Sequence, residues 1–246
     1  MKKILFYLIF VIIPFCSFSQ ATELSKDECN TKIRAIWENS SKKEAKQKVS
    51  QLCLANPNNS ASLLNLYFLR SGIDKIELKN AIDKLSTENQ SDAYAKSLKY
   101  YIENDQIKIG DRFTDFKATT STGETFILSE VLKSKDVLLI FDGLSCVSES
   151  VIQELINIDN KIDKKKVEII SFIFAKNADE LMNELKSYKI PWLGVSDFKQ
   201  DHSKTKINYN VQGRPTYIYI DSTGKVLVNE PGALSKKAMK LLKEHI

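Results

Sequence analysis

Two nearly unbroken apolar runs limit what the second half of this chain can fold into. Residues 137–141 and 167–175 have the length of strands and almost no polar residues, which is typical of strands buried on both faces of a sheet. Helical patterns follow the two runs, over residues 149–162 and 177–188. Strands that alternate with helices predict an α/β fold, with a central mixed sheet flanked by helices.

Shorter elements are expected around these two units. A Ser-Thr-Gly turn separates two short strands, and a hairpin lies near the end of the chain, where Pro215 can open a strand because its missing N–H costs no ladder bond there. The predicted strands are 113–119, 125–128, 215–221 and 226–228, and the predicted short helices are 129–135 and 234–246.

The first part of the chain has a helical pattern instead. From residue 23 to about 103, apolar residues recur at spacings of three and four, which predicts four or five short helices. Ser60 is placed to cap one helix, and Pro57 to end the helix before it. We expect an all-α region over residues 20–107 and the α/β domain over residues 108–246. The polar breaks between helices are 39–41, 56–60, 71–72 and 86–91.

Residues 1–19 have the layout of a secretory signal peptide. Lys2 and Lys3 precede an apolar run, residues 4–15, that is too short to span a bilayer comfortably. Small residues precede a cleavage site between Ser19 and Gln20. This layout predicts an exported protein, periplasmic or extracellular.

Cys16 allows a second interpretation, because bacterial lipoproteins are cut directly before a cysteine that then carries the lipid. Pro14 and bulky Phe15 stand where that cleavage prefers small residues. We therefore favour export without lipid, and expect membrane attachment only if Cys16 is lipidated.

The distribution of charges and ligand residues argues against several partner classes. The net charge of +5 is spread along the chain, with no dense Lys/Arg stripe, and predicts no nucleic-acid partner. Zinc-ligand spacing and a glycine-rich phosphate loop are both absent, so we expect no metal and no cofactor. His202 lies in a polar loop, where a hydrogen-bonded or solvated histidine is more common than a catalytic base.

Three cysteines remain after cleavage at residue 19, and an oxidising compartment permits disulfides. Cys29 and Cys53 lie in neighbouring helical segments and are the natural pair, which leaves Cys146 as the odd thiol. The alternative is that all three are small buried apolar residues.

Cys146 stands between the strand at 137–141 and the helical segment that begins near Ser148. Unpaired backbone N–H groups and the positive end of the helix dipole favour a thiolate at such a corner. Asp142 lies four residues earlier, where it either tunes the pKa of Cys146 or serves as a turn residue. The corner predicts redox or nucleophilic sulfur chemistry.

Four motifs follow one another through the second half of the chain: Ile109–Phe116, 137–146, Ile190–Asp197 and Tyr209–Asp221. By these motifs residues 108–246 resemble the redoxin branch of the thioredoxin superfamily, in particular exported thiol-disulfide oxidoreductases of the TlpA/ResA type from Bacteroidetes-type bacteria. The resemblance implies a thioredoxin-like fold, with Cys146 as the nucleophile and Pro215 as a cis-proline facing it. Arg214 and Thr216 beside that proline are then expected to contact substrate. The helical region resembles an accessory region of some members.

The active-site motif departs from the Trp-Cys-x-x-Cys of that family. Ser145 replaces the tryptophan and Glu149 replaces the resolving cysteine, so the usual dithiol cycle cannot close. The charge of Glu149 would raise the pKa of the Cys146 thiol and oppose the effect of the helix terminus. Ile152 stands where many members carry a glutamate, and Thr114 replaces a proline of the opening motif.

Cys-x-x-Glu is also similar to the peroxiredoxin site, but Gly143 and Pro215 stand where peroxiredoxins carry threonine and arginine. A peroxidase is therefore the least favoured hypothesis. The first hypothesis is a monothiol oxidoreductase that acts through Cys146 on protein or small-molecule thiols and disulfides, with an external reductant. The second is a redox-inactive protein that uses the same fold to bind a partner.

Overall fold

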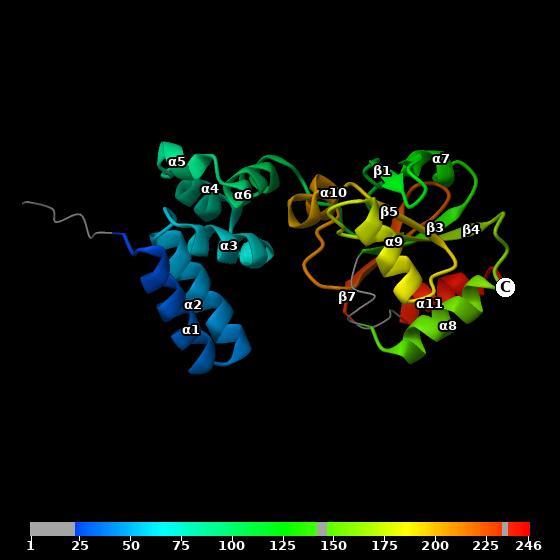
Figure 1. Cartoon of the computed structure of the whole chain (residues 1–246), viewed down its shortest axis with the longest axis horizontal. Helices are drawn as coiled ribbons and strands as arrows, with labels where there is room; N and C mark the ends of the chain where they lie inside the picture. Colours follow the sequence, from blue (N-terminus) through cyan, green and yellow to red (C-terminus); the bar gives the residue numbers. More distant parts are fainter. Residues whose placement is uncertain (1–22, 142–146, 233–235) are drawn as a thin grey trace, which may run out of the picture.

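The computed structural model describes residues 23–141, 147–232 and 236–246. Figure 1 shows its two parts side by side: a group of helices from the first part of the chain, and a sheet with helices around it from the second part. The α/β fold with a central mixed sheet and the all-α region before it are therefore as predicted. Within these residues no helix is long and apolar enough to cross a membrane.

The second part is organised around a seven-stranded mixed sheet, in the order β2-β1-β5-β4-β3-β6-β7. The central strands β3, β4 and β5 are parallel, and antiparallel strands extend the sheet on both sides. The strands are β1 (Lys117–Thr120), β2 (Thr125–Ile127), β3 (Asp136–Phe141), β4 (Val167–Phe172), β5 (Leu193–Ser196), β6 (Thr216–Ile220) and β7 (Val226–Pro231).

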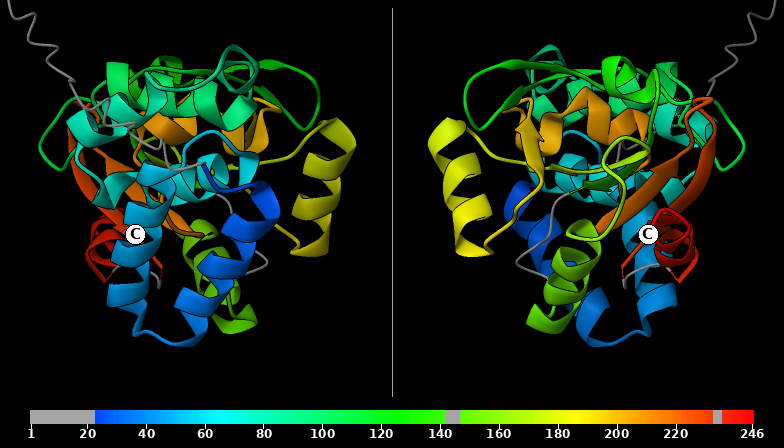
Figure 2. Two further views of the ribbon diagram at one scale, coloured as in Figure 1. Left: turned by 90° about the vertical axis from the view of Figure 1, so that its left-hand side faces the viewer. Right: turned by 90° about the vertical axis from the view of Figure 1, so that its right-hand side faces the viewer.

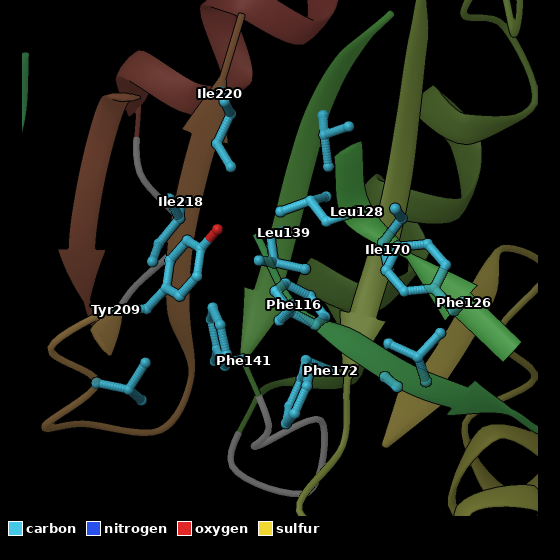
Figure 3. Close-up of a cluster of buried hydrophobic side chains, with 14 of the residues drawn as sticks. Phe116, Phe126, Leu128, Leu139, Phe141, Ile170, Phe172, Tyr209, Ile218 and Ile220 are labelled. Atoms are coloured by element: carbon cyan, nitrogen blue, oxygen red, sulfur yellow. The ribbon is translucent and has the colours of Figure 1, made fainter. Parts of the chain in front are cut away.

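Side chains of β3 alternate between the two faces of the sheet. Leu139 and Phe141 pack into one core, Leu138 and Ile140 into the other, and all four are at most 1% exposed. The first core is rich in aromatic rings, among them Phe116, Phe126, Phe172 and Tyr209 (Figure 3). A strand covered on both faces has to be apolar throughout, which accounts for the unbroken run in the sequence.

The second core lies between the sheet and two helices, α8 (Glu149–Asp159) and α11 (Lys236–Lys243). Helix α9 (Ala178–Ser187) packs beside β5, and Figure 2 shows α9 and α11 on opposite sides of the molecule. The remaining elements of this part are α7 (Leu128–Leu132), the short 3-10 helix η3 (Gln200–His202) and α10 (Lys204–Asn208).

Strand β5 was not among the predicted strands. Four residues that include Gly194 and Ser196 carry little strand propensity. The pairing of β5 with β1 and β4 fixes its conformation, and Gly194 leaves room there for the Leu185 side chain of α9.

The helical part contains six α-helices within residues 23–107, one more than the four or five predicted, because the four-residue α5 is a separate element. The predicted breaks at 39–41 and 56–60 lie between helices, whereas α5 lies within the predicted break 86–91 and residues 71–72 belong to a short 3-10 helix. Asn59, and not the predicted Ser60, caps α3: its Oδ1 accepts from the Ser62 backbone N–H at 2.9 Å, and Ser60 is the first helical residue. The elements are α1 (Lys26–Glu38), α2 (Lys42–Ala55), α3 (Ser60–Leu69), the 3-10 helix η1 (Arg70–Gly72), α4 (Lys75–Ile82), α5 (Thr87–Gln90) and α6 (Ala93–Glu103).

Cys29 of α1 and Cys53 of α2 are fully buried in the core of the helical part. Both are free thiols in the structure, so the predicted disulfide is not formed in it and pairing stays a prediction. Burial raises the pKa of Cys53 to about 12, and the adjacent Cys29 adds to the rise. The Cys29 thiol lies 3.3 Å from the Ser62 hydroxyl oxygen.

We expect Leu139→Ala to lower the free energy of unfolding of the second part by about 2–5 kcal/mol, because it leaves a cavity in a fully covered strand. Urea denaturation followed by circular dichroism measures this. Ile76→Ala is the matched control, since Ile76 is 70% exposed. Equal losses in the two variants would contradict the packing described for β3.

We expect Cys29 and Cys53 to form a disulfide when the chain folds under oxidising conditions, and the bond to add about 3 kcal/mol of stability by restricting the unfolded chain. Peptide mapping without reduction checks the pairing. Recovery of both residues as separately alkylated peptides after oxidative folding would rule it out, and the stability control is Cys29→Ala with Cys53→Ala.

Candidate functional site

The Arg214–Pro215 peptide bond is cis, as the resemblance implies for Pro215. Thr216 follows it as the first residue of β6 and pairs with Phe141, the last residue of β3. The cis bond therefore lies at the edge of the sheet where β3 ends. The substrate-binding roles of these three residues stay predictions.

Local hydrogen bonds hold this turn in place. The Thr216 hydroxyl donates to the Gly213 carbonyl oxygen at 2.8 Å, and the Gly232 N–H donates to the Pro215 carbonyl oxygen at 2.8 Å. Pro215 itself is buried. These contacts come from β6 and the end of β7, so the sheet itself sets the position of the cis bond.

Helix α8 begins at Glu149, directly after Ser148. The Glu149 side chain is exposed in the first turn, where a negative charge is favourable to the helix dipole. Ile152 is 6% exposed and packs inward. Because it is an isoleucine, that position provides no titratable group. Cys146 and Asp142 lie outside the described residues, as do Gly143 and Ser145.

Arg214 extends from the cis bond into a polar network. Its Nη2 lies 2.8 Å from Asp201 Oδ1, and its guanidinium lies 5.2 Å from the centre of the Phe174 ring. The same Asp201 oxygen pairs with Lys206 Nζ, and the Lys206 residue is only 4% exposed. A buried ammonium group needs such a carboxylate close by, because desolvation alone would be very costly.

Burial raises the pKa of Asp201, but the hydrogen bonds and positive charges of Lys206 and Arg214 outweigh this effect and hold the pKa below its ordinary value. Burial lowers the pKa of Lys206, and Asp201 opposes that decrease. The folded state therefore favours the charged form of the Asp201 carboxyl group, beside Arg214.

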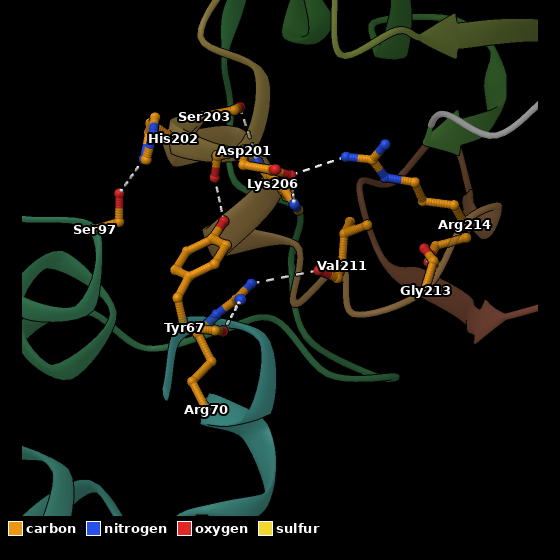
Figure 4. A network of polar contacts seen from close by, with 11 residues as sticks. Tyr67, Arg70, Ser97, Asp201, His202, Ser203, Lys206, Val211, Gly213 and Arg214 are labelled. Carbon is orange, nitrogen blue, oxygen red and sulfur yellow. Dashed lines mark hydrogen bonds and ion pairs between the residues drawn. The ribbon is translucent and has the colours of Figure 1, made fainter. Parts of the chain in front are cut away.

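The helical part contributes to the same network, as Figure 4 shows. The Tyr67 hydroxyl donates to the backbone carbonyl oxygen of Asp201. Arg70, 1% exposed, donates to the carbonyl oxygens of Tyr67 at 2.6 Å and of Val211 at 3.4 Å. The segment that leads to the cis bond is therefore held from both parts of the chain.

His202 lies in the contact between the two parts. Its Nδ1 is 3.1 Å from the Ser97 hydroxyl oxygen of α6, and its ring centre is 4.7 Å from that of Tyr94. The hydrogen-bonded histidine predicted from the sequence is what the structure contains.

A pocket of about 360 Å³ opens at this contact. It lies beyond the end of β4, at the edge of the sheet where ligands of α/β proteins commonly bind. Polar residues dominate its walls, with Arg214 and Asp201 on one side and Tyr94 of the helical part on another. The lining residues are Tyr94, Ile173, Phe174, Ala175, Glu180, Glu184, Gln200, Asp201, His202 and Arg214.

Sequence reasoning found Arg214, Pro215 and His202 but missed Asp201, Lys206, Tyr67 and Arg70. Tyr67 fits the apolar face of a helix, and Lys206 stands among other lysines. The adjacent acid in Asp201-His202 was the one local signal in this group. Among the described residues, no three His, Cys, Asp or Glu side chains are grouped so as to hold a metal ion.

A carboxyl group whose pKa is lowered on folding adds stability above its unfolded pKa, about 4, and loses it as the pH falls through the folded value. We expect Asp201→Asn to cost about 3 kcal/mol at neutral pH, because Lys206 loses its buried partner. The wild-type advantage should shrink below about pH 4. Urea denaturation at both pH values measures this, with the exposed Asp105→Asn as control, and an advantage that does not change with pH would contradict it.

Comparison with known proteins matches residues 108–242 to the Redoxin family. Comparison with curated proteins gives no significant match.

Similar solved structures cover little more than half of the chain. A thiol-disulfide oxidoreductase from Bacteroides fragilis is 21% identical, with a TM-score of 0.49, over 55% of this chain and 100% of that chain. The thioredoxin domain of a thiol-disulfide oxidoreductase from Bacteroides vulgatus is 21% identical, with a TM-score of 0.48, over 56% and 99%. A thiol:disulfide interchange protein from Bacteroides sp. is 19% identical, with a TM-score of 0.49, over 56% and 90%.

The family match covers more than half of the 246 residues and includes the sheet, the cis bond and Arg214. The chain therefore belongs to the Redoxin family.

Proposed function

We propose that this protein is an exported thiol-disulfide oxidoreductase that works with a single thiol, Cys146. The observation that carries the proposal is the pairing of Phe141 with Thr216, which places Arg214 and Pro215 next to the end of β3. In the sequence, Cys146 follows β3 by only five residues. At most about 18 Å of chain then separates the cysteine from the strand end that adjoins the cis bond.

The proposed reaction is one thiol-disulfide exchange. The Cys146 thiolate attacks one sulfur of a substrate disulfide, a new sulfur–sulfur bond forms to Cys146, and the other substrate sulfur leaves as a thiolate. An external thiolate then attacks the substrate sulfur of the mixed disulfide, and Cys146 leaves as a thiolate. A second external thiolate displaces the substrate sulfur from the first, so the substrate is reduced and the two external thiols, which supply the two electrons, end as one disulfide.

Glu149 explains why the second thiol has to come from outside. It occupies the first turn of α8, three residues after Cys146, where the family carries the resolving cysteine. A carboxylate cannot attack a mixed disulfide and release the product as a thiolate sulfur does. The mixed disulfide is therefore longer-lived than in a dithiol enzyme.

Export is part of the proposal and rests on residues 1–19, which lie outside the described residues. The signal-peptide layout supports it, with lipidation at Cys16 as the alternative form. Mass spectrometry of the mature N-terminus distinguishes a chain that begins at Gln20 from one that begins at a lipid-modified Cys16.

A redox-inactive binding protein is the second candidate. The loss of the resolving cysteine and the polar pocket beside Arg214 favour it. It predicts a Cys146 that does not react with alkylating agents or peroxide at neutral pH while a partner still binds Cys146→Ser. Peroxide consumption by the wild type would instead favour the peroxidase hypothesis.

We expect the wild type, supplied with glutathione, to reduce a glutathionylated peptide well above the uncatalysed rate, and Cys146→Ser to lose this activity. Cys53→Ala is the control, because Cys53 is fully buried in the helical part. Mass spectrometry without added reductant should detect a glutathione adduct on Cys146. Equal turnover by wild type and Cys146→Ser would end the proposal.

Glu149→Cys tests the monothiol step separately. The added thiol can displace the bound glutathione and form an internal disulfide, so the trapped adduct should disappear in this variant. An adduct that persists at the wild-type level in Glu149→Cys would show that residue 149 is not in the resolving position.

A further inference from the structure

A second and larger pocket lies on the helical part, beside the segment that leads to the cis bond. It measures about 760 Å³. Its walls come from α2, the end of α3, η1 and the start of α4, together with Gln212 of the redoxin domain. The residues that line it are Lys43, Lys46, Gln47, Ser50, Gln51, Leu54, Phe68, Leu69, Ser71, Gly72, Ile73, Glu77 and Gln212; it is called the helical pocket below.

We propose that the helical pocket binds a segment of the substrate polypeptide, so that the disulfides reduced at Cys146 are those of extended polypeptides. The segment that fits best carries a large apolar side chain next to an acidic one. This inference rests on the proposed function, because it assigns a substrate class to the same redox site.

Continuity with the cis bond is the first support. Gln212 lines the helical pocket, and Arg214, two residues later, lines the polar pocket at the end of β4. Three residues of chain span at most about 11 Å, so Gln212 lies within that distance of Pro215. An extended peptide of a few residues is long enough to occupy the helical pocket and reach the cis bond.

An aromatic bridge connects the two pockets as well. Phe68 lines the helical pocket, and its ring centre lies 6.4 Å from that of Tyr94, which lines the polar pocket. Phe68 also packs edge to face on Tyr67 at 5.3 Å. The two pockets thus belong to one surface that both parts of the chain share.

Contacts between the two parts fix the spacing of this surface. Tyr67 and Arg70 flank Phe68 and Leu69 in the sequence, and they bond to the carbonyl oxygens of Asp201 and Val211. Val211 directly precedes Gln212. The pocket and the cis bond are therefore held at a set separation, as a binding site for one continuous ligand requires.

The lining determines the chemistry of the occupant. Leu54, Leu69 and Ile73 form an apolar wall, and Phe68 is 46% exposed, which leaves apolar area for a ligand to cover. Two lysines of α2, Lys43 and Lys46, line the pocket, and they outnumber its one lining carboxylate, Glu77 of α4. An apolar side chain flanked by carboxylates complements this combination.

Binding can be measured without redox chemistry in full-length Cys146→Ser. The probe is a short fluorescein-labelled peptide with aspartates around a leucine and a phenylalanine, and a serine in place of cysteine. We expect saturable binding by fluorescence anisotropy, weakened about tenfold by Phe68→Ser. Lys46→Glu should weaken it as well, most strongly at low salt, and should improve binding of the same peptide with lysines in place of aspartates.

Matched controls exclude a general effect of surface changes. Trp37→Ser removes another part-exposed aromatic ring, 39% exposed in α1, and Lys96→Glu reverses an exposed charge on α6; neither residue lines the pocket. Both should leave peptide affinity unchanged. Unchanged affinity in a Phe68→Ser protein with wild-type circular dichroism would overturn the inference.

Kinetics with active Cys146 separate this inference from the proposed function. Phe68→Ser should slow reduction of the same peptide carrying a glutathionylated cysteine, and should not slow reaction with a small aromatic disulfide. Equal slowing of both substrates would overturn the pocket assignment alone. A wild type that reacts with neither substrate, yet binds the peptide, would overturn the redox function and support a peptide-binding protein.

Discussion

The antiparallel pairing of β3 with β6 is the constraint on which the rest of the site depends. The register places Phe141 opposite Thr216. The end of β3 and the cis bond that precedes β6 therefore lie at the same edge of the sheet. A shift of one residue would turn every side chain of β3 to the wrong core. Since both cores are filled by large buried side chains, the register has little freedom.

The two parts of the chain meet at this same edge. Asp201 accepts from Tyr67 through its backbone and pairs with Lys206 and Arg214 through its side chain. One residue thereby connects the helical part, a buried cation and the side chain beside the cis bond. The helical part consequently contacts the segment that leads to the cis bond, and a change in its packing would reach Arg214 through only two contacts.

Glu149 distinguishes this chain from the Cys-x-x-Cys pattern of the proteins that it resembles. In the first turn of α8 its charge suits the helix dipole, so a glutamate is compatible with the fold at the position where the resemblance places the resolving cysteine. The cis bond and the strand pairing next to it are retained. The proposed monothiol cycle therefore needs an external thiol to finish.

The sequence by itself determined most element types, the helix breaks at 39–41 and 56–60 and the position of Pro215, because apolar period, caps and turn residues are local properties. It did not predict β5, whose conformation depends on β1 and β4. It also missed Tyr67 and Arg70, whose partners Asp201 and Val211 are 134 and 141 residues away in the sequence. Lys206 was missed because its burial depends on packing, although its partner Asp201 is only five residues away. Only the docking of the two parts decides that a buried arginine and a tyrosine of the helical part hold the segment that leads to the cis bond.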